Sequence, residues 1–362
     1  MAPRVLDAGG DIALYISKRR AAHVLPDARI CLFEHGGGYK PDGYVSDDVH
    51  RLLDRGVLRL GALRRARRRS VGAPPAPTRR RNFRRLKFFR KGVFPMVYKV
   101  LTIAGSDCSG GAGVQADLKT IESFGLFGQS AITSLTAQNT LGVNAVFDAS
   151  PEFVEAQIDA VFDDMVPDAV KIGMISSSAI AEAVARALRR RDARHIVVDP
   201  VMVATSGADL MRDGAVRAVV GDLFPLAEVI TPNLSEARAL CGFDIVDAAG
   251  MERAARMLAG MTSGAVLVKG GHLDESADDC LVFDGRTCWL RGTRVDTGNT
   301  HGTGCTLSSA IACGLASGKS AIDSVRVAKA YVAGALSSGF SMGKGSGPLD
   351  HMWRLREALA SL

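Results

Sequence analysis

Residues 96–362 are predicted to form an α/β domain, on three observations. Short apolar segments alternate with helical segments of ten or more residues, a pattern typical of parallel strands joined by helices. The chain is 47% hydrophobic, which is enough for a sizeable core. Polar and glycine residues gather just after the predicted strands, where open α/β sheets bind their ligands. We therefore expect helices on both faces of a mostly parallel sheet, with one site at its carboxyl edge.

The individual elements follow from the spacing of apolar residues. Short apolar runs predict strands at 100–104, 128–135, 169–172, 195–198, 228–230 and 265–268. Helical spacing predicts helices at 113 to about 124, 151–165, 178–190 and 248–259. A hairpin is expected around Asp284-Gly285, between strands 280–283 and 287–290. Two long helices follow Cys305 and end near Ser337.

Residues 1–95 do not resemble a domain. They hold 22 Lys and Arg against 8 Asp and Glu, whereas the rest of the chain holds 23 basic and 30 acidic residues. An arginine-rich segment with interleaved aromatics, such as 79–91, can bind nucleic acid or an anionic membrane. The alternative is a disordered tail, or a start codon assigned too far upstream. We favour this second interpretation, because Met96 directly precedes the first strand of a complete domain.

The cysteines and the apolar segments indicate the cellular compartment of the protein. Seven cysteines without regular spacing are typical of reduced thiols in the cytoplasm. No stretch approaches the ~20 apolar residues that cross a bilayer, and the first thirty residues lack a signal-peptide pattern. Asp42, Asp47 and Asp48 argue against a transit peptide. We therefore expect a cytoplasmic protein with neither a membrane nor a nucleic acid as partner.

The stretch 296–316 is the strongest candidate for chemistry. It passes through Gly302, Thr303 and Gly304 into an apolar helix. Glycines at a helix start expose backbone N–H groups, which together with the helix dipole can bind a developing negative charge. Cys305 lies at that start, where a thiol can have a lowered pKa. The alternative is a helix with packing glycines and an inert cysteine.

Other polar residues follow neighbouring strands. Asp199 follows one strand, and Asn233 and Glu236 follow the next. The carboxylates of Asp199 and Glu236 would hold Mg²⁺ through water. Each could instead be a helix cap or turn residue. Lys269 ends the next strand and could neutralise a phosphate, or be a solvated lysine.

Further residues could read a heterocycle. Asp117 and Gln138 offer an acceptor and an amide to the edge of a polar ring, although surface or capping roles are open to both. His301, just before the glycine turn, could be a base or a phosphate contact, or a plain loop histidine.

Seven segments in order resemble one family. They are LTIAGSDCSGGAGVQADLKT, TAQNT, KIGMI, DPVM, TPNLSEA, VKGGH and THGTGCTLSSAIA. Together they are similar to the hydroxymethylpyrimidine/phosphomethylpyrimidine kinases of thiamine biosynthesis, within the ribokinase-like superfamily. The resemblance runs from about Val97 to Tyr331. It implies a three-layer α/β/α fold, ATP and Mg²⁺ as cofactors, a small-molecule pyrimidine as substrate, and a homodimer.

The resemblance also implies roles for individual residues. Four would bind the aminopyrimidine, namely Gly105, Asp117, Gln138 and Met174. Mg²⁺ would be bound by Asp199 and Glu236, and ATP by Asn233, Lys269 and Thr303. The anion hole would consist of Gly302, Gly304 and Cys305.

Two departures and two alternatives accompany this interpretation. Most of the superfamily carries an aspartate general base where Cys305 stands, and many relatives carry lysine where Thr205 stands. A pyridoxal kinase would share the fold and the cysteine, but the TAQNT segment favours the pyrimidine enzyme. A regulator that senses the pyrimidine and contacts nucleic acid through its basic arm would not need the metal and anion-hole motifs.

We predict that a chain beginning at Met96 is as stable and as active as the full chain. The charge balance reverses there, and every candidate site residue lies downstream. Such short apolar pieces are not expected to offset an ordering cost of ~1–2 kcal/mol per residue. Thermal unfolding and pyrimidine phosphorylation by the truncated chain check this. Misfolding or lost activity would show that residues 1–95 are a working part.

Overall fold

The computed structural model describes residues 97–203, 207, 210–211, 214–271, 277–339 and 341–360, together with three short strands near the N-terminus. The chain divides into two compact units, Met1–Arg90 and Lys91–Leu362. In the first, β1 (Leu6–Ala8) pairs antiparallel with β2 (Asp11–Tyr15), which pairs parallel with β3 (Ile30–Cys31). The sequence did not predict these strands. The rest of the predicted extension lies outside the described residues.

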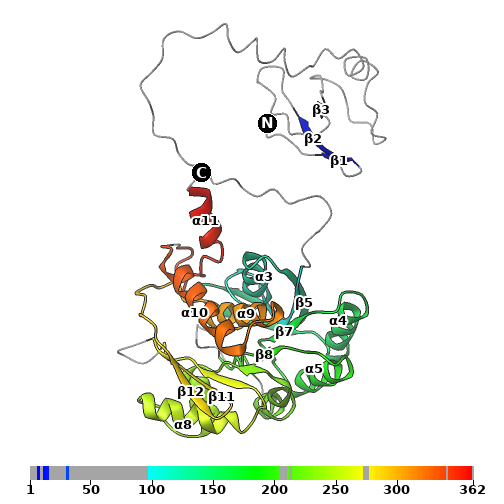
Figure 1. The fold of residues 1–362 in the computed structure, drawn as a ribbon. Helices are drawn as coiled ribbons and strands as arrows, with labels where there is room; N and C mark the ends of the chain where they lie inside the picture. The colour runs from blue at the N-terminus through cyan, green and yellow to red at the C-terminus, as the bar shows by residue number, and fades with distance from the viewer. Residues whose placement is uncertain are drawn as a thin grey trace, which may run out of the picture. The chain divides into compact units, whose positions relative to one another are not determined.

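The second unit is built on a nine-stranded sheet, which confirms the predicted α/β fold (Figure 1). In spatial order the strands are β12 (Arg286–Leu290), β11 (Asp279–Phe283), β10 (Ala265–Val268), β9 (Val229–Ile230), β8 (Ile196–Val198), β7 (Ala169–Ile172), β4 (Lys99–Asp107), β5 (Phe127–Asn139) and β6 (Gly142–Asp148). The six strands from β10 to β5 are parallel, and the remaining pairings, β5–β6, β10–β11 and β11–β12, are antiparallel.

Helices cover the sheet. They are α3 (Gly113–Ser123), α4 (Pro151–Asp164), α5 (Ser178–Arg190), α6 (Ala215–Ala218), α7 (Leu234–Cys241), α8 (Ala248–Ala259), α9 (Thr303–Ala316), α10 (Ala321–Ser337) and α11 (Trp353–Ala360), with short π and 3₁₀ turns at Val219–Leu223 and Phe224–Leu226. Among the described helices, none combines the length and apolar character needed to cross a bilayer.

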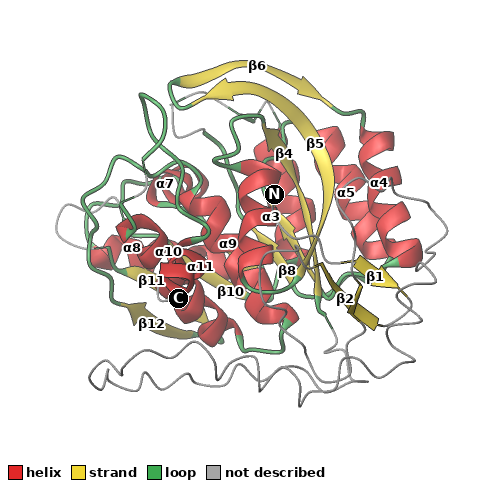
Figure 2. Ribbon diagram, turned by 90° about the horizontal axis from the view of Figure 1, so that it is seen from above, coloured by secondary structure: helices red, strands yellow, loops and turns green. Residues whose placement is uncertain are grey.

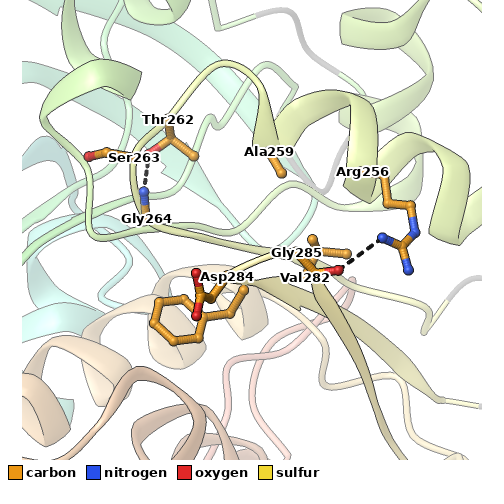
Figure 3. Close-up of a pocket in the computed structure, with 9 residues that line it drawn as sticks. Arg256, Ala259, Thr262, Ser263, Gly264, Val282, Asp284 and Gly285 are labelled. Carbon is orange, nitrogen blue, oxygen red and sulfur yellow. Dashed lines mark hydrogen bonds between the residues drawn. The ribbon is translucent and has the colours of Figure 1, made fainter.

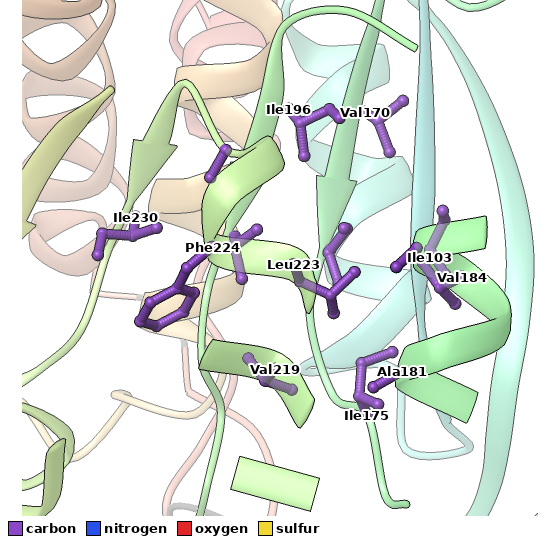
Figure 4. Packing of buried hydrophobic residues seen from close by; sticks show 14 of the residues in the cluster. Ile103, Val170, Ile175, Ala181, Val184, Ile196, Val219, Leu223, Phe224 and Ile230 are labelled. Carbon is purple, nitrogen blue, oxygen red and sulfur yellow. The ribbon is translucent and has the colours of Figure 1, made fainter. Parts of the chain in front are cut away.

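The core consists of two apolar clusters, one on each face of the sheet. Successive strand residues alternate between them, as the period of a strand requires: Ile196 and Val198 pack with α4, α5 and α8, whereas Val197 packs with α9 and α10. Figure 4 shows part of the first cluster, where Ile103 of β4 lies beside Val184 of α5, and Ile230 of β9 lies near Phe224. The result is a three-layer α/β/α unit.

The predicted boundaries were wrong mainly at the carboxyl ends of the first two strands. β4 continues to Asp107, past the predicted end at residue 104, because its parallel pairing with β5 resumes after an irregularity between Ala104 and Ser106. β5 likewise continues to Asn139 and turns into β6, which was not predicted. The two strands form a long curved hairpin at one edge of the sheet (Figure 2). β6 is hard to recognise because most of its residues are exposed on both faces.

We predict that Gly314→Ala destabilises the unit. A Cβ on this α9 glycine would lie 2.5 Å from Oγ and 2.9 Å from Cα of Ser324 in α10, so the helices would have to separate. Such overpacking costs about 1–3 kcal/mol in the free energy of unfolding, measurable by urea denaturation. Gly221→Ala is the control, because a Cβ there meets nothing within 4 Å. Equal effects at the two positions would contradict the prediction.

Candidate active site

The start of α9 lies at the carboxyl edge of the sheet, as predicted. Its N-cap, Gly302, has φ 82°, the left-handed region that favours glycine, and no side chain caps the helix. A Cβ on Gly302 would also collide with the carbonyl oxygen of Gly111. The hydroxyl of Thr303 donates to the Thr300 carbonyl at 2.7 Å and steadies the turn before it. This helix start can therefore receive an anion on its backbone N–H groups.

A buried ion pair lies against the helix start. Lys269 Nζ, after β10, donates to Asp199 Oδ1, after β8, at 2.8 Å. A Cβ on Gly304 would lie 3.2 Å from Asp199 Oδ2 and 3.3 Å from Lys269 Nζ. Burial raises the pKa of Asp199, but Lys269 and the more distant charge of Lys171 outweigh it, so this pKa is lowered. The structure thus brings together the predicted anion hole, the predicted lysine and one predicted metal ligand.

Asn233 and Glu236 cap α7 and also face this ion pair. The backbone N–H of Glu236 donates to Asn233 Oδ1 at 2.9 Å, and the N–H of Asn233 donates to Glu236 Oε2 at 2.7 Å, which is a capping box. Burial raises the pKa of Glu236 to about 7; Lys269 opposes this shift and the charge of Asp199 adds to it.

A divalent cation would suit these two carboxylates. They are buried, they repel each other, and oxygen ligands are the kind that Mg²⁺ prefers. Among the described residues no group of three or more His, Cys, Asp or Glu side chains is arranged as a metal site. Asp199 and Glu236 therefore fit a cation that keeps much of its water.

Cys305 is in the first turn of α9, but its thiol is not activated in this structure. Burial raises its pKa to about 11; the charge of Lys171 lowers it, and the carboxylates of Asp117 and Asp199 raise it. The expectation of a lowered pKa is therefore wrong for this form of the site. The helix start alone does not offset desolvation of the thiolate.

A buried charge pair lies nearby that the sequence analysis only partly recognised. Lys171 in β7 donates to both carboxylate oxygens of Asp117, at 2.9 and 2.8 Å, and both side chains are fully buried. The hydroxyls of Thr102 and Ser309 donate to the same carboxylate at 2.6 and 2.8 Å. Burial lowers the pKa of Lys171, but the charges of Asp117 and Asp199 and the hydrogen bonds to Asp117 raise it by more, so the lysine stays protonated.

The Lys171–Asp117 pair affects what was predicted for each of its two residues. The predicted contact of Asp117 with a ring stays a prediction, since three donor groups enclose its carboxylate here with four hydrogen bonds. Lys171 was missed because it stands inside an apolar strand. The signal was available, because a charge in a fully buried strand requires a partner.

The other residues predicted to bind the ring lie on neighbouring strands. A Cβ on Gly105 of β4 would lie 2.9 Å from Met174 Sδ, so Met174, two residues after β7, packs directly over that glycine. Gln138 is half-buried near the end of β5, next to β4 in the sheet. These three positions form a patch beside the start of α9. Thr205 and His272 lie outside the described residues.

A separate hollow of about 240 Å³ lies elsewhere (Figure 3). It is lined by Arg256, Thr262 and Gly264 with the β11–β12 turn, and none of the predicted site residues lines it. Gly264 directly precedes β10 whereas Lys269 follows it, so the hollow lies at the opposite end of that strand. The candidate site is therefore the carboxyl edge rather than this hollow.

Known proteins resemble the chain over this whole unit. A family model described as phosphomethylpyrimidine kinase matches residues 107–350. A hydroxymethylpyrimidine/phosphomethylpyrimidine kinase of Rhizobium meliloti is 52% identical over 258 residues, covering 70% of this chain and 97% of that protein. The counterpart from Streptomyces coelicolor is 47% identical, covering 71% and 96%.

Solved structures add the fold. A phosphomethylpyrimidine kinase of Clostridium difficile is 42% identical with a TM-score of 0.59, covering 65% of this chain and 97% of that one. An ADP complex of Bacillus subtilis pyridoxal kinase is 34% identical with a TM-score of 0.66, covering 72% and 99%. The ribokinase-like architecture is thereby confirmed.

We predict that Glu236→Gln gains stability over the native chain as pH rises. Folded Glu236, with a pKa of about 7, keeps a proton that the unfolded carboxyl, near 4.5, releases. Native stability should therefore fall between these values, by at most ~1.4 kcal/mol per pKa unit. Glutamine can still cap the helix but does not ionise.

Urea unfolding at pH 5 and pH 8 without divalent cations checks this, and millimolar Mg²⁺ should shrink the advantage of the variant at pH 8. Glu252→Gln on α8 is the control. Hydrogen bonds from Thr287 and Arg256 lower the pKa of Glu252, so its replacement should shift stability in the opposite sense. The same advantage for Glu236→Gln at both pH values would contradict the raised pKa.

Proposed function

Because the chain belongs to the phosphomethylpyrimidine kinase family, we propose that it transfers the γ-phosphoryl group of ATP to 4-amino-5-hydroxymethyl-2-methylpyrimidine. It would then phosphorylate the monophosphate to the diphosphate, in thiamine biosynthesis. The observation that carries the proposal is the convergence of an uncapped helix start with the Asp199–Lys269 pair at Gly304. Phosphoryl transfer relies on this combination of positioning and charge.

The transferred group would lie between the helix start and Lys269. The backbone N–H groups of Gly302, Gly304 and Cys305 would receive the charge that develops on its oxygens, and Lys269 would neutralise the phosphates. Asn233 and Thr303 flank this space from the starts of α7 and α9. Asp199 and Glu236 would hold Mg²⁺ through water, and the bound ion supplies positive charge to the phosphates.

The pyrimidine would lie on the β7–β4–β5 side of the helix start. Gly105 leaves room for Met174, which would pack against the ring, and Gln138 would offer its amide to the ring edge. Asp117 would act indirectly: it binds Lys171, whose charge favours the thiolate of Cys305. Cys305 would accept or relay the proton of the substrate hydroxyl, which requires the bound state to lower its pKa.

A second candidate substrate is pyridoxal, because pyridoxal kinases have TM-scores of 0.66–0.67 against 0.59 for the Clostridium difficile phosphomethylpyrimidine kinase. An ATP-consumption assay with hydroxymethylpyrimidine, its monophosphate and pyridoxal side by side decides between them. We expect the highest kcat/KM with the pyrimidines. A clear preference for pyridoxal would overturn the proposed substrate.

We also propose a cytoplasmic homodimer. The support for self-association is the β5–β6 edge, where β6 is the last strand of the sheet among the described residues and Phe147 is 72% exposed. Leu135, Leu141 and Val146 add exposed apolar surface to the same hairpin. Exposed apolar edges of this kind are typical of association sites. The molecular mass in solution tests the proposal.

We predict that Gln138→Ala lowers kcat/KM for the pyrimidine by about tenfold or more. Losing a buried hydrogen-bond partner costs about 1–3 kcal/mol, while the ATP side of the site is untouched. Steady-state kinetics with each substrate varied in turn measure both effects. An unchanged kcat/KM for the pyrimidine would remove Gln138 from the site, and an equal rise in both KM values would indicate general damage.

We predict that Cys305→Ala folds and binds ATP but turns over roughly 10²–10⁴-fold more slowly, the range for loss of a general base. Cys305→Asp should recover part of the rate, because Lys171 also favours a carboxylate there. Cys313→Ala, farther along α9 in the core, is the matched control and should retain turnover. Near-full turnover by Cys305→Ala would show that the thiol only packs.

A further inference from the structure

Asp107, the last residue of β4, organises the glycine-rich turn that follows it. Its carboxylate is 2% exposed and accepts from the backbone N–H and hydroxyl of Ser109 at 2.8 and 2.7 Å. It also accepts from the N–H groups of Gly111 and Ala112 at 3.1 and 2.8 Å. Ala112 is the N-cap of α3 and has no capping side chain of its own. Asp107 thus caps the turn and the helix together.

The same carboxylate reaches the loop before α9. His301 Nε2 lies 2.9 Å from Asp107 Oδ2, and the imidazole is 12% exposed. His301 directly precedes Gly302, the N-cap of α9. The two loops are also in close contact, since a Cβ on Gly111 would lie 2.5 Å from His301 Cδ2. A hydrogen bond to an ionised carboxylate is about twice as strong as a neutral one, so the pair ties these loops firmly.

Asp107 also lies beside the proposed pyrimidine-binding strand β5. It pairs with Thr136 of β5, and the backbone of Gln138, two residues further on, contacts the Cys108 thiol at 3.2 and 3.3 Å. Burial raises the pKa of Asp107, yet the hydrogen bonds from His301, Ser109 and Ala112 and the nearby Gln138 side chain hold it far below its usual range. One ionised group therefore contacts the residue before the proposed anion hole and lies near the residue proposed to bind the pyrimidine.

We propose that Asp107 and His301 are positioning residues that fix the start of α9 relative to the pyrimidine-binding strands. Neither would touch the transferred group. Asp107 orients the nearby Gln138 amide. Through its hydrogen bond to His301 it also fixes the positions of Gly302 and Cys305 relative to the substrate hydroxyl. A displacement of about 1 Å in such an alignment can lower turnover about 10²-fold. The inference rests on the proposed kinase function, and it replaces the open possibility that His301 is a base or a phosphate contact.

Steady-state kinetics of His301→Ala, His301→Gln, Asp107→Asn and the Asp107→Asn/His301→Ala double variant test the proposal. We expect His301→Ala to lower kcat about 10–100-fold, as loss of a supporting partner does at other sites, with the Kd for ATP within about twofold. His301→Gln, which retains a side-chain donor, should recover part of kcat. The double variant should be no slower than Asp107→Asn alone, because the two residues act through one bond.

Ser109→Ala is the matched control. It removes a hydrogen bond to Asp107 inside the turn but none between the loops, so kcat should stay within about threefold. Native kcat in His301→Ala, additive losses in the double variant, or an equal loss in Ser109→Ala would each overturn the proposal. Melting temperatures identify variants that are slow only because they unfold.

Amide hydrogen exchange separates this inference from the proposed function. His301→Ala should speed exchange at residues 108–112 and 302–306, whether or not the native chain phosphorylates a pyrimidine. If the native chain phosphorylates none, the proposed function fails, and faster exchange in the variant still supports the link between the loops. Unchanged exchange in both segments would overturn the link itself.

Discussion

The carboxylate of Asp199 is the charge on which the carboxyl edge of the sheet depends. It accepts from Lys269 and Thr231 and lies within the field of Lys171 and Glu236. The charges of the two lysines offset that of Asp199 in the interior, whereas Glu236 adds a repulsive charge. Buried ion pairs add little net stability compared with apolar packing, yet losing one partner costs about 3–5 kcal/mol. Such an arrangement is therefore better explained by chemistry at the site than by stability.

Glycines set the distances within this edge. Gly302 allows the turn before α9 to touch Gly111, Gly304 leaves the Asp199–Lys269 pair against the helix, and Gly105 lets Met174 lie over β4. A methyl group at any of these positions would meet a neighbour at or within ordinary contact distance. The backbone can thus come close to a ligand, while the side chains that carry charge stay fixed by buried hydrogen bonds.

The sequence predicted the interior of the fold well and its margins poorly. Runs such as Ala169–Ile172 and Ala265–Val268 are wholly apolar or nearly so and end where predicted, as do α5 and α8. β6 was missed because an exposed edge strand lacks the alternation that burial imposes.

The candidate site was likewise predicted in part. Convergence of the strand ends was predictable from topology, but two features were not. Asp107 was placed after the end of the first strand because the β5 pairing that extends β4, and the contact with His301, come from residues distant in sequence. The pKa of Cys305 depends on desolvation and on charges from three other elements, which no local pattern records.

The division of the site between α9 and the strands β7, β4 and β5 has a consequence for how such an enzyme diversifies. In the proposed site the phosphate-binding groups lie on one side and the ring-binding surface on the other, so mutations on the strands would change which vitamin precursor is accepted while leaving the transfer step intact. A designer who grafts a new ring-binding surface onto this scaffold would exchange Met174 and Gln138 freely but retain the carboxylate at the end of β4. The redesigned enzyme would then keep the alignment of the groups proposed to transfer the phosphoryl group.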